Sequence, residues 1–169
     1  MLRRDEESRI ESEYTRVRSV SDHAYMGCGS GQRLLQLIVH PAFEGWLAWE
    51  VIRSQEGWKL YKIDVVETAP SILLKGWKKL SISSVILEQF QRRIASLALP
   101  LDIGEPIIGA DGATTQLAAF SGFAEWRFRW WSHNPPTWQP LVDIADEMFV
   151  AFSAAGVAHD ETHLPPIEQ

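Results

Sequence analysis

Cys28 is the first residue in this chain whose side chain could do chemistry, and it is the single cysteine among 169 residues. It lies in the glycine-rich stretch 26–32, and His23 and His40 are close to it in the sequence. A cysteine and a histidine are the minimum for a thiol nucleophile, because the histidine removes the thiol proton. However, a glycine-rich loop is a poor platform for catalysis, and no helix N-terminus can be assigned there to activate the thiol. We therefore interpret Cys28 as an incidental thiol.

Two further motifs resemble ligand-binding signatures, and neither predicts a ligand. The glycine run at 27–31 could let the backbone approach a phosphate, but only between a buried strand and a helix, which the flanking residues do not favour. His159 and His163 have the spacing of the zinc-binding His-Glu-x-x-His helix. The residue after His159 is Asp160 rather than glutamate, no third ligand follows, and two prolines close the segment. The sequence therefore predicts no cofactor and no metal site.

The remaining polar and aromatic candidates suit binding to a protein better than catalysis. Three carboxylates lie off the apolar stripe of a predicted helix, where they usually form a solvated face. Trp131 falls on the outward side of a predicted strand, and Trp138 follows two prolines just before the helix. An exposed tryptophan next to charged residues has the composition of a protein-interface hot spot, unless loops or the N-terminal arm cover it. The expected partner-binding residues are Glu125, Trp131, Trp138, Asp143, Asp146 and Glu147.

The stretch 111–152 contains the elements that must position these residues. Residues 123–131 alternate between aromatic and charged side chains, which is the period of a half-buried strand. Their aromatic side, Trp126, Phe128 and Trp130, should face the core. The helix that follows has apolar residues spaced three and four apart, which makes one stripe that should pack on these aromatics. The stripe consists of Leu141, Ile144, Ala145, Met148, Phe149 and Phe152.

Five segments have the apolar alternation or apolar continuity of strands. They are residues 33–40, 45–53, 58–66, 114–120 and 123–131. Residues 67–81 look like a connection, because Pro70 and Gly76 interrupt them. A second helix is predicted at 84–99, ended by Pro100. The two tryptophans of the 45–53 segment, Trp46 and Trp49, fall on opposite sides, so that one of them is a candidate for exposure.

The order strands, helix, strands, helix is typical of an α+β fold. We expect a mainly antiparallel sheet of about five strands with two principal helices packed on one face. A chain of 169 residues is large enough for one domain with a sizeable core. We place this domain at 23–156, between a flexible N-terminal arm at 1–22 and a loose C-terminal tail at 157–169.

The charge balance excludes some classes of partner. The formal net charge is −6, and the part from residue 101 onward holds 10 acidic and 2 basic side chains, a net of −8. Nucleic acid is therefore not expected, because phosphates need lysine and arginine. The N-terminus has no apolar secretory segment, and no apolar run approaches the roughly 20 residues that span a bilayer. We expect a cytoplasmic protein without a membrane partner, whose acidic half suits a basic protein or serves solubility alone.

Four stretches of the C-terminal half together resemble a known arrangement. They are the helix at 84–99 with Pro100, the Asp-Gly turn at 109–112, the aromatic strand at 125–131 and the Pro-Pro-Thr-Trp run at 135–141. The arrangement is similar to small immunity proteins that bacteria encode beside the secreted toxins of polymorphic and contact-dependent systems. This resemblance implies an antitoxin rather than an enzyme, which binds and neutralises one cognate toxin by stoichiometric contact. It carries over no site residues, because such families bind through whichever surface their toxin requires.

Two other functions stay open. A secretion adaptor or chaperone for an effector is also small, acidic and cytoplasmic, but it grips an extended segment and is usually dimeric. A stable dimer without a partner would favour that alternative. A small enzyme that uses Cys28 with a histidine would need a thiol of markedly lowered pKa. The sequence does not indicate the oligomeric state.

Overall fold

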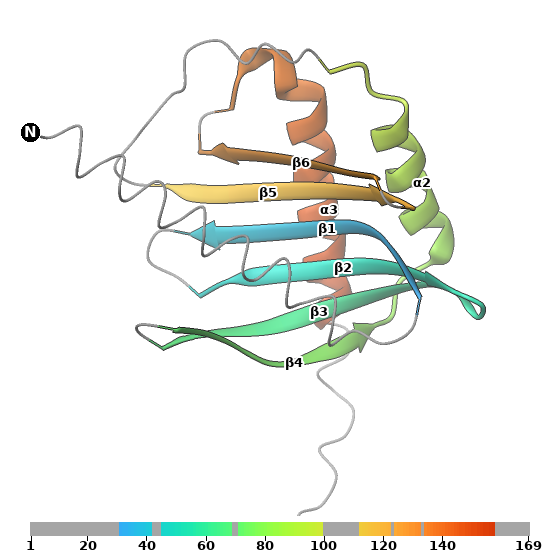
Figure 1. The fold of residues 1–169 in the computed structure, drawn as a ribbon, viewed down its shortest axis with the longest axis vertical. Helices are drawn as coiled ribbons and strands as arrows, with labels where there is room; N and C mark the ends of the chain where they lie inside the picture. Colours follow the sequence, from blue (N-terminus) through green and yellow to red (C-terminus); the bar gives the residue numbers. More distant parts are fainter. Residues whose placement is uncertain are drawn as a thin grey trace, which may run out of the picture.

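The protein is described by a computed structural model over residues 31–41, 45–68, 71–99, 112–122, 124–132 and 134–157. These residues form a six-stranded antiparallel sheet with two α-helices on one face (Figure 1). The predicted α+β class, with two helices on one face of an antiparallel sheet, is therefore confirmed; the sheet has six strands where about five were expected. The elements are β1 (Gln32–Pro41), β2 (Leu47–Ser54), β3 (Gly57–Thr68), β4 (Ser71–Leu80), α2 (Ser84–Ala95), β5 (Ala113–Ser121), β6 (Ala124–Trp131), the 3-10 helix η1 (Pro136–Trp138) and α3 (Gln139–Val157).

The strand order β4-β3-β2-β1-β5-β6 follows from two local units. The first four strands form a meander, in which each strand pairs with the next one along the chain. The chain then passes through α2 and adds the β5–β6 hairpin to the other side of β1. As a result, β1 lies in the middle of the sheet, and β4 and β6 form its two edges.

Strand β4 corrects the prediction that residues 67–81 are only a connection. Strand β4 begins at Ser71, so that Pro70 precedes it in the sequence and lies outside the described residues. Gly76 pairs with Asp64 beside a register shift in β3, which is where an irregular edge tolerates glycine. An edge strand pairs on one side only and does not need a continuous apolar pattern, which is why the sequence signal was weak.

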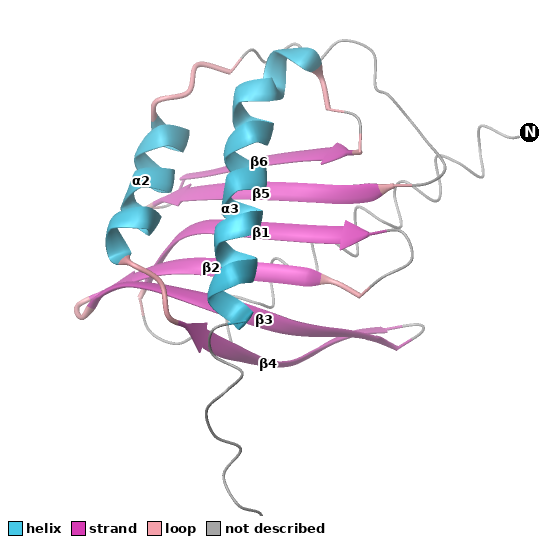
Figure 2. Ribbon diagram, turned by 180° about the vertical axis from the view of Figure 1, so that it is seen from behind, coloured by secondary structure: helices cyan, strands magenta, loops and turns pink. Residues whose placement is uncertain are grey.

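The helix-covered face of the sheet holds the larger core. The predicted apolar stripe of α3 faces the strands, as do Leu87 and Phe90 of α2, and α3 crosses the sheet at a steep angle to the strands (Figure 2). Phe152 is fully buried, with ring centroids 6.2 Å from Trp49 of β2 and 5.9 Å from Phe90 of α2. This one side chain therefore joins α3 to the sheet and to the other helix. The part of the chain that the structure describes has no helix able to cross a membrane.

The second face of the sheet is buried as well. Ile38, Ala48, Ile52 and Ile63 have at most 2% exposure and form a cluster there with Tyr61. Trp46 belongs to the same cluster and Trp49 to the helix-covered core, so the expectation that one of these two tryptophans is exposed was wrong. Both are buried, each within the apolar cluster of its own face of the sheet.

A polar group lies within this second face. Glu50 is fully buried, accepts a hydrogen bond from Gln36 Nε2 at 2.8 Å, and lies 3.3 Å from the guanidinium of Arg33. A buried carboxylate is tolerated only when such donors offset its loss of hydration. These contacts belong to the fold and leave the carboxylate inaccessible.

Candidate functional site

The outer side of α3 gathers three of the six predicted binding residues. Asp143, Asp146 and Glu147 are exposed, whereas the apolar stripe on the opposite side of the helix faces the sheet. Val150 lies one turn after Asp146 and Glu147 on the same side, and its side chain is 67% exposed. We call these four residues the α3 outer stripe. It places three carboxylates along a rigid helix, followed by one exposed apolar side chain at the end of the row.

One carboxylate of the α3 outer stripe is neutralised within the protein. Both oxygens of Glu147 accept hydrogen bonds from Arg93 of α2, at 2.5 and 2.8 Å. These bonds lower the pKa of Glu147 and raise that of Arg93. Because both side chains are exposed, water screens the pair, and its role is mainly to fix the position of α2 against α3.

The other two carboxylates of the α3 outer stripe lie close enough for their charges to interact. Partial burial raises the pKa of Asp146, and the charge of Asp143 one turn away raises it further. Asp143 accepts a hydrogen bond of 2.7 Å from Gln139, a neutral group. Among the described residues, no cation forms a salt bridge with either aspartate. The charge of Arg93, which pairs with Glu147, also attracts that of Asp143. The two aspartates still repel each other, and a cationic partner would interact favourably with both.

The other three predicted residues do not join this surface. Glu125 lies on the second face of β6, where it forms an ion pair with Arg127. Trp131 is half-buried on that same face. Trp138 is only 9% exposed and lies edge-on to Phe128, with ring centroids 5.4 Å apart, on the helix-covered face. The expectation that Trp138 is an exposed contact was wrong, because the 3-10 turn folds its ring into the core.

Two other tryptophans, Trp126 and Trp77, are exposed, although the sequence analysis did not predict exposure for either of them. Trp126 was expected in the core from its alternation with Phe128 and Trp130, yet it is 54% exposed. Alternation assigns a face of the strand, but β6 is an edge, and the two helices pack mainly against β1 and β3 rather than β6. Trp77 of β4 is 45% exposed and lies edge-on to Tyr61. Each edge of the sheet thus carries one exposed tryptophan.

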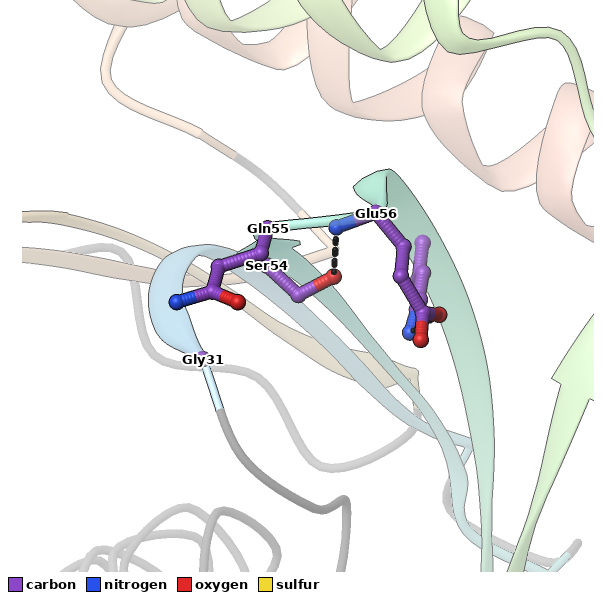
Figure 3. A pocket seen from close by; sticks show the side chains of 5 residues that line it. Gly31, Ser54, Gln55 and Glu56 are labelled. Atoms are coloured by element: carbon purple, nitrogen blue, oxygen red, sulfur yellow. Dashed lines mark hydrogen bonds and ion pairs between the residues drawn. The ribbon is translucent and has the colours of Figure 1, made fainter.

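A hollow of about 380 Å³ lies beside the β2–β3 turn and is lined by Gly31, Ser54, Gln55, Glu56 and Lys59 (Figure 3). Its polar groups are used by the turn itself. The Ser54 hydroxyl accepts from the Glu56 amide at 3.2 Å and donates to the Gly57 carbonyl at 3.3 Å. Lys59 donates to Glu56 at 2.6 Å, which lowers the pKa of Glu56 and raises that of Lys59. Glu56 is the one carboxylate among the described residues that line this hollow, and its ion pair with Lys59 occupies the group that a serine nucleophile would need as its base.

The chemistry weighed from the sequence finds no support in the described residues. Cys28, His23, His159 and His163 lie outside them, as do the predicted N-terminal arm at 1–22 and the tail beyond Val157. The ring of His40 stacks on Trp46 with centroids 3.9 Å apart, so that it serves packing. Within the part of the chain described, no three metal-ligating side chains come together.

Comparison with known proteins adds no family to this picture. No protein-family model matches the chain, and no curated protein sequence matches it. The functional argument therefore depends on the geometry of the surfaces. Among the described surfaces, the α3 outer stripe combines a pair of neighbouring like charges with an exposed apolar side chain on a rigid helix.

Proposed function

We propose that this chain is a cytoplasmic immunity protein, which binds and neutralises one cognate protein toxin by stoichiometric contact. The observation that carries the proposal is the pair of like charges at Asp143 and Asp146 on the α3 outer stripe, with Val150 exposed beside it. An isolated fold would be more stable without this repulsion, so a role outside the fold explains why the charges are present.

The partner that fits such a surface has a basic cleft. Toxins that act on nucleic acid have clefts lined by lysine and arginine, because their substrates are polyanions. Carboxylates held on a helix can occupy such a cleft and exclude the substrate. Val150 would supply apolar contact beside the carboxylates, and apolar side chains that become buried contribute much of the binding free energy. The resemblance of the C-terminal half to immunity proteins points to the same class of partner.

The first test is capture of the partner from the native host with the tagged full-length chain. The expected result is one protein, bound in a ratio of one per chain, that is toxic when expressed alone and harmless when co-expressed. Capture of no protein by the folded chain would contradict the proposal. A partner that binds through an extended segment, at one segment per two chains, would instead support the secretion adaptor.

The second test measures association with the captured partner in stopped flow at several salt concentrations. Asp143→Lys with Asp146→Lys should slow association by about tenfold or more, and should flatten its salt dependence, because steering by opposite charge is lost. Asp64→Lys is the matched control, since Asp64 is an exposed aspartate on β3, away from the α3 outer stripe. Equal effects of the control and the double variant would refute this choice of surface.

A further inference from the structure

The edge of the sheet at β6 has features that its role in the fold does not require. Among the described residues, β5 is the only strand paired with β6, so one side of its backbone faces away from the sheet. Its first residues, Ala124 and Glu125, are exposed, and Trp126 is 54% exposed. An edge strand that shows a large aromatic side chain is a template for pairing with another strand.

The hairpin geometry decides which backbone groups face outward. Ser121 pairs with Ala124, so that two residues lie between them. The two residues that flank a two-residue turn form two backbone hydrogen bonds with each other. Counting from Ala124, every second residue of β6 then directs its N–H and C=O toward β5, and the residues between them direct theirs away from it. Ala124, Trp126 and Phe128 therefore bond to β5. Glu125 and Arg127 direct their backbone groups to the outer edge.

The sequence of this edge is complementary to itself in one register. If two copies of β6 pair antiparallel with Trp126 opposite Trp126, each Glu125 stands opposite an Arg127. In a register in which Arg127 is the residue opposite its own copy, the two arginines repel each other. In the next register, with Phe128 opposite Phe128, each Arg127 stands opposite an Arg129. Opposite charges directly across a strand pair stabilise it and like charges destabilise it, so only the first register is favoured.

We propose that β6 pairs with β6 of a second copy of this chain, antiparallel and centred on Trp126. The two six-stranded sheets then join into one continuous sheet about a two-fold axis. Each Glu125 gains a second arginine beside the Arg127 of its own chain, and the two Trp126 rings cover each other.

The other edge of the sheet does not offer the same pairing. Strand β4 carries Lys78 and Lys79 and lies against a register shift in β3. Lysines and irregular pairing at an edge are common ways in which proteins prevent strand addition. This difference is why we assign the second copy to β6, although Trp77 on β4 is nearly as exposed as Trp126.

A contact of this kind is small, and the affinity should be correspondingly modest. It pairs a few residues of one strand in each copy, which is below the area of a stable dimer interface. We expect a dissociation constant of about 1–100 µM. The proposal does not depend on the identity of any toxin, because the α3 outer stripe lies on the helix layer and stays accessible.

Sedimentation equilibrium of the full chain, over about 1–500 µM, tests this inference directly. The wild type should change from monomer to dimer within that range. Glu125→Arg and Arg127→Glu should each weaken dimerisation by about tenfold or more, because each creates two like-charge pairs across the two-fold axis. The double variant Glu125→Arg/Arg127→Glu restores both pairs and should regain the wild-type affinity. Trp126→Ala should also weaken the dimer, whereas Trp77→Ala should not.

The outcomes separate the proposal from its competitors. A wild type that stays monomeric at about 500 µM overturns it. A dimer that is insensitive to both single reversals, or that depends on Trp77, places the contact elsewhere and overturns it too. Circular dichroism of each variant confirms that it is folded.

The double variant also tests the register. In the register centred on Arg127, each Glu125 would stand opposite Arg129, so that reversing the charge of Glu125 would create two like-charge pairs. Reversing Arg127 as well would not relieve them, because Arg127 would face only its own copy. Failure of the double variant to recover would therefore overturn the register centred on Trp126.

Discussion

Replacement of Phe152 by alanine tests how α3, and with it the α3 outer stripe, is held on the sheet. The Phe152 side chain has 0% exposure and lies between Trp49 of β2 and Phe90 of α2. Its removal leaves a cavity at the point where both helices and the sheet meet. Changes from phenylalanine to alanine at such sites destabilise proteins by about 3–5 kcal/mol, through lost burial and the cavity together.

Urea denaturation followed by tryptophan fluorescence measures the effect. With an m-value of about 2 kcal/mol/M, a loss of about 4 kcal/mol moves the midpoint down by about 2 M. Phe152→Leu keeps most of the volume and should cost about 1–2 kcal/mol. The graded pair separates the loss of volume from any general intolerance of α3 to substitution.

Val150→Ala is the matched control on the same helix. Val150 is 67% exposed and makes no part of the core, so its replacement should change stability by less than about 0.5 kcal/mol. If Phe152→Ala cost no more than Val150→Ala, then Phe152 would not fill the space between β2 and α2. In that case the assignment of the Val150 side of α3 to solvent would also be wrong.

The two carboxylates of α3 with shifted pKa values lead to opposite dependences on pH. The pKa of Asp146 is raised in the fold, so its charge destabilises the fold at neutral pH and stops doing so once it is protonated. Asp146→Asn should therefore be more stable than the wild type at pH 7, and thermal unfolding should show no difference near pH 3; a less stable variant at pH 7 would instead assign Asp146 a partner within the fold. The pKa of Glu147 is lowered by Arg93, so its stabilising effect is present above its unfolded pKa and disappears as the pH falls through the folded pKa. Glu147→Gln should be less stable at pH 7 and equal to the wild type near pH 3; a difference that persists there would assign the effect to something other than this ion pair.

Much of the fold could be predicted because its units are local. Clear periodicity marks the segments that form β1, β2, β3, β5 and β6, and it also marks both helices. The predicted ends of the helices were correct to within a few residues. β4 was missed because proline and glycine count as breakers when read from the sequence alone. Whether they interrupt a strand depends on whether it lies at an edge, and that is decided by pairing far along the chain.

The candidate site was predictable only where it depends on one helix. The exposure of Asp143, Asp146 and Glu147 follows from the helical period. The ion pair between Arg93 and Glu147 joins residues 54 positions apart and needs the two helices to be neighbours. The burial of Trp138 could not be read from its neighbours either, because it depends on contact with Phe128 across a turn.

The two proposed surfaces fit together in a way that bears on the choice between antitoxin and adaptor. In an antiparallel strand pair, side chains directly opposite each other lie on the same face of the sheet. Joining two copies through β6 therefore places both helix layers, and both α3 outer stripes, on one side of the combined sheet. Each stripe remains complete within its own chain, so a dimer of this kind would bind one toxin per chain. An adaptor dimer that grips one extended segment needs a site shared between its subunits, and the pairing of β6 provides none on the helix layer.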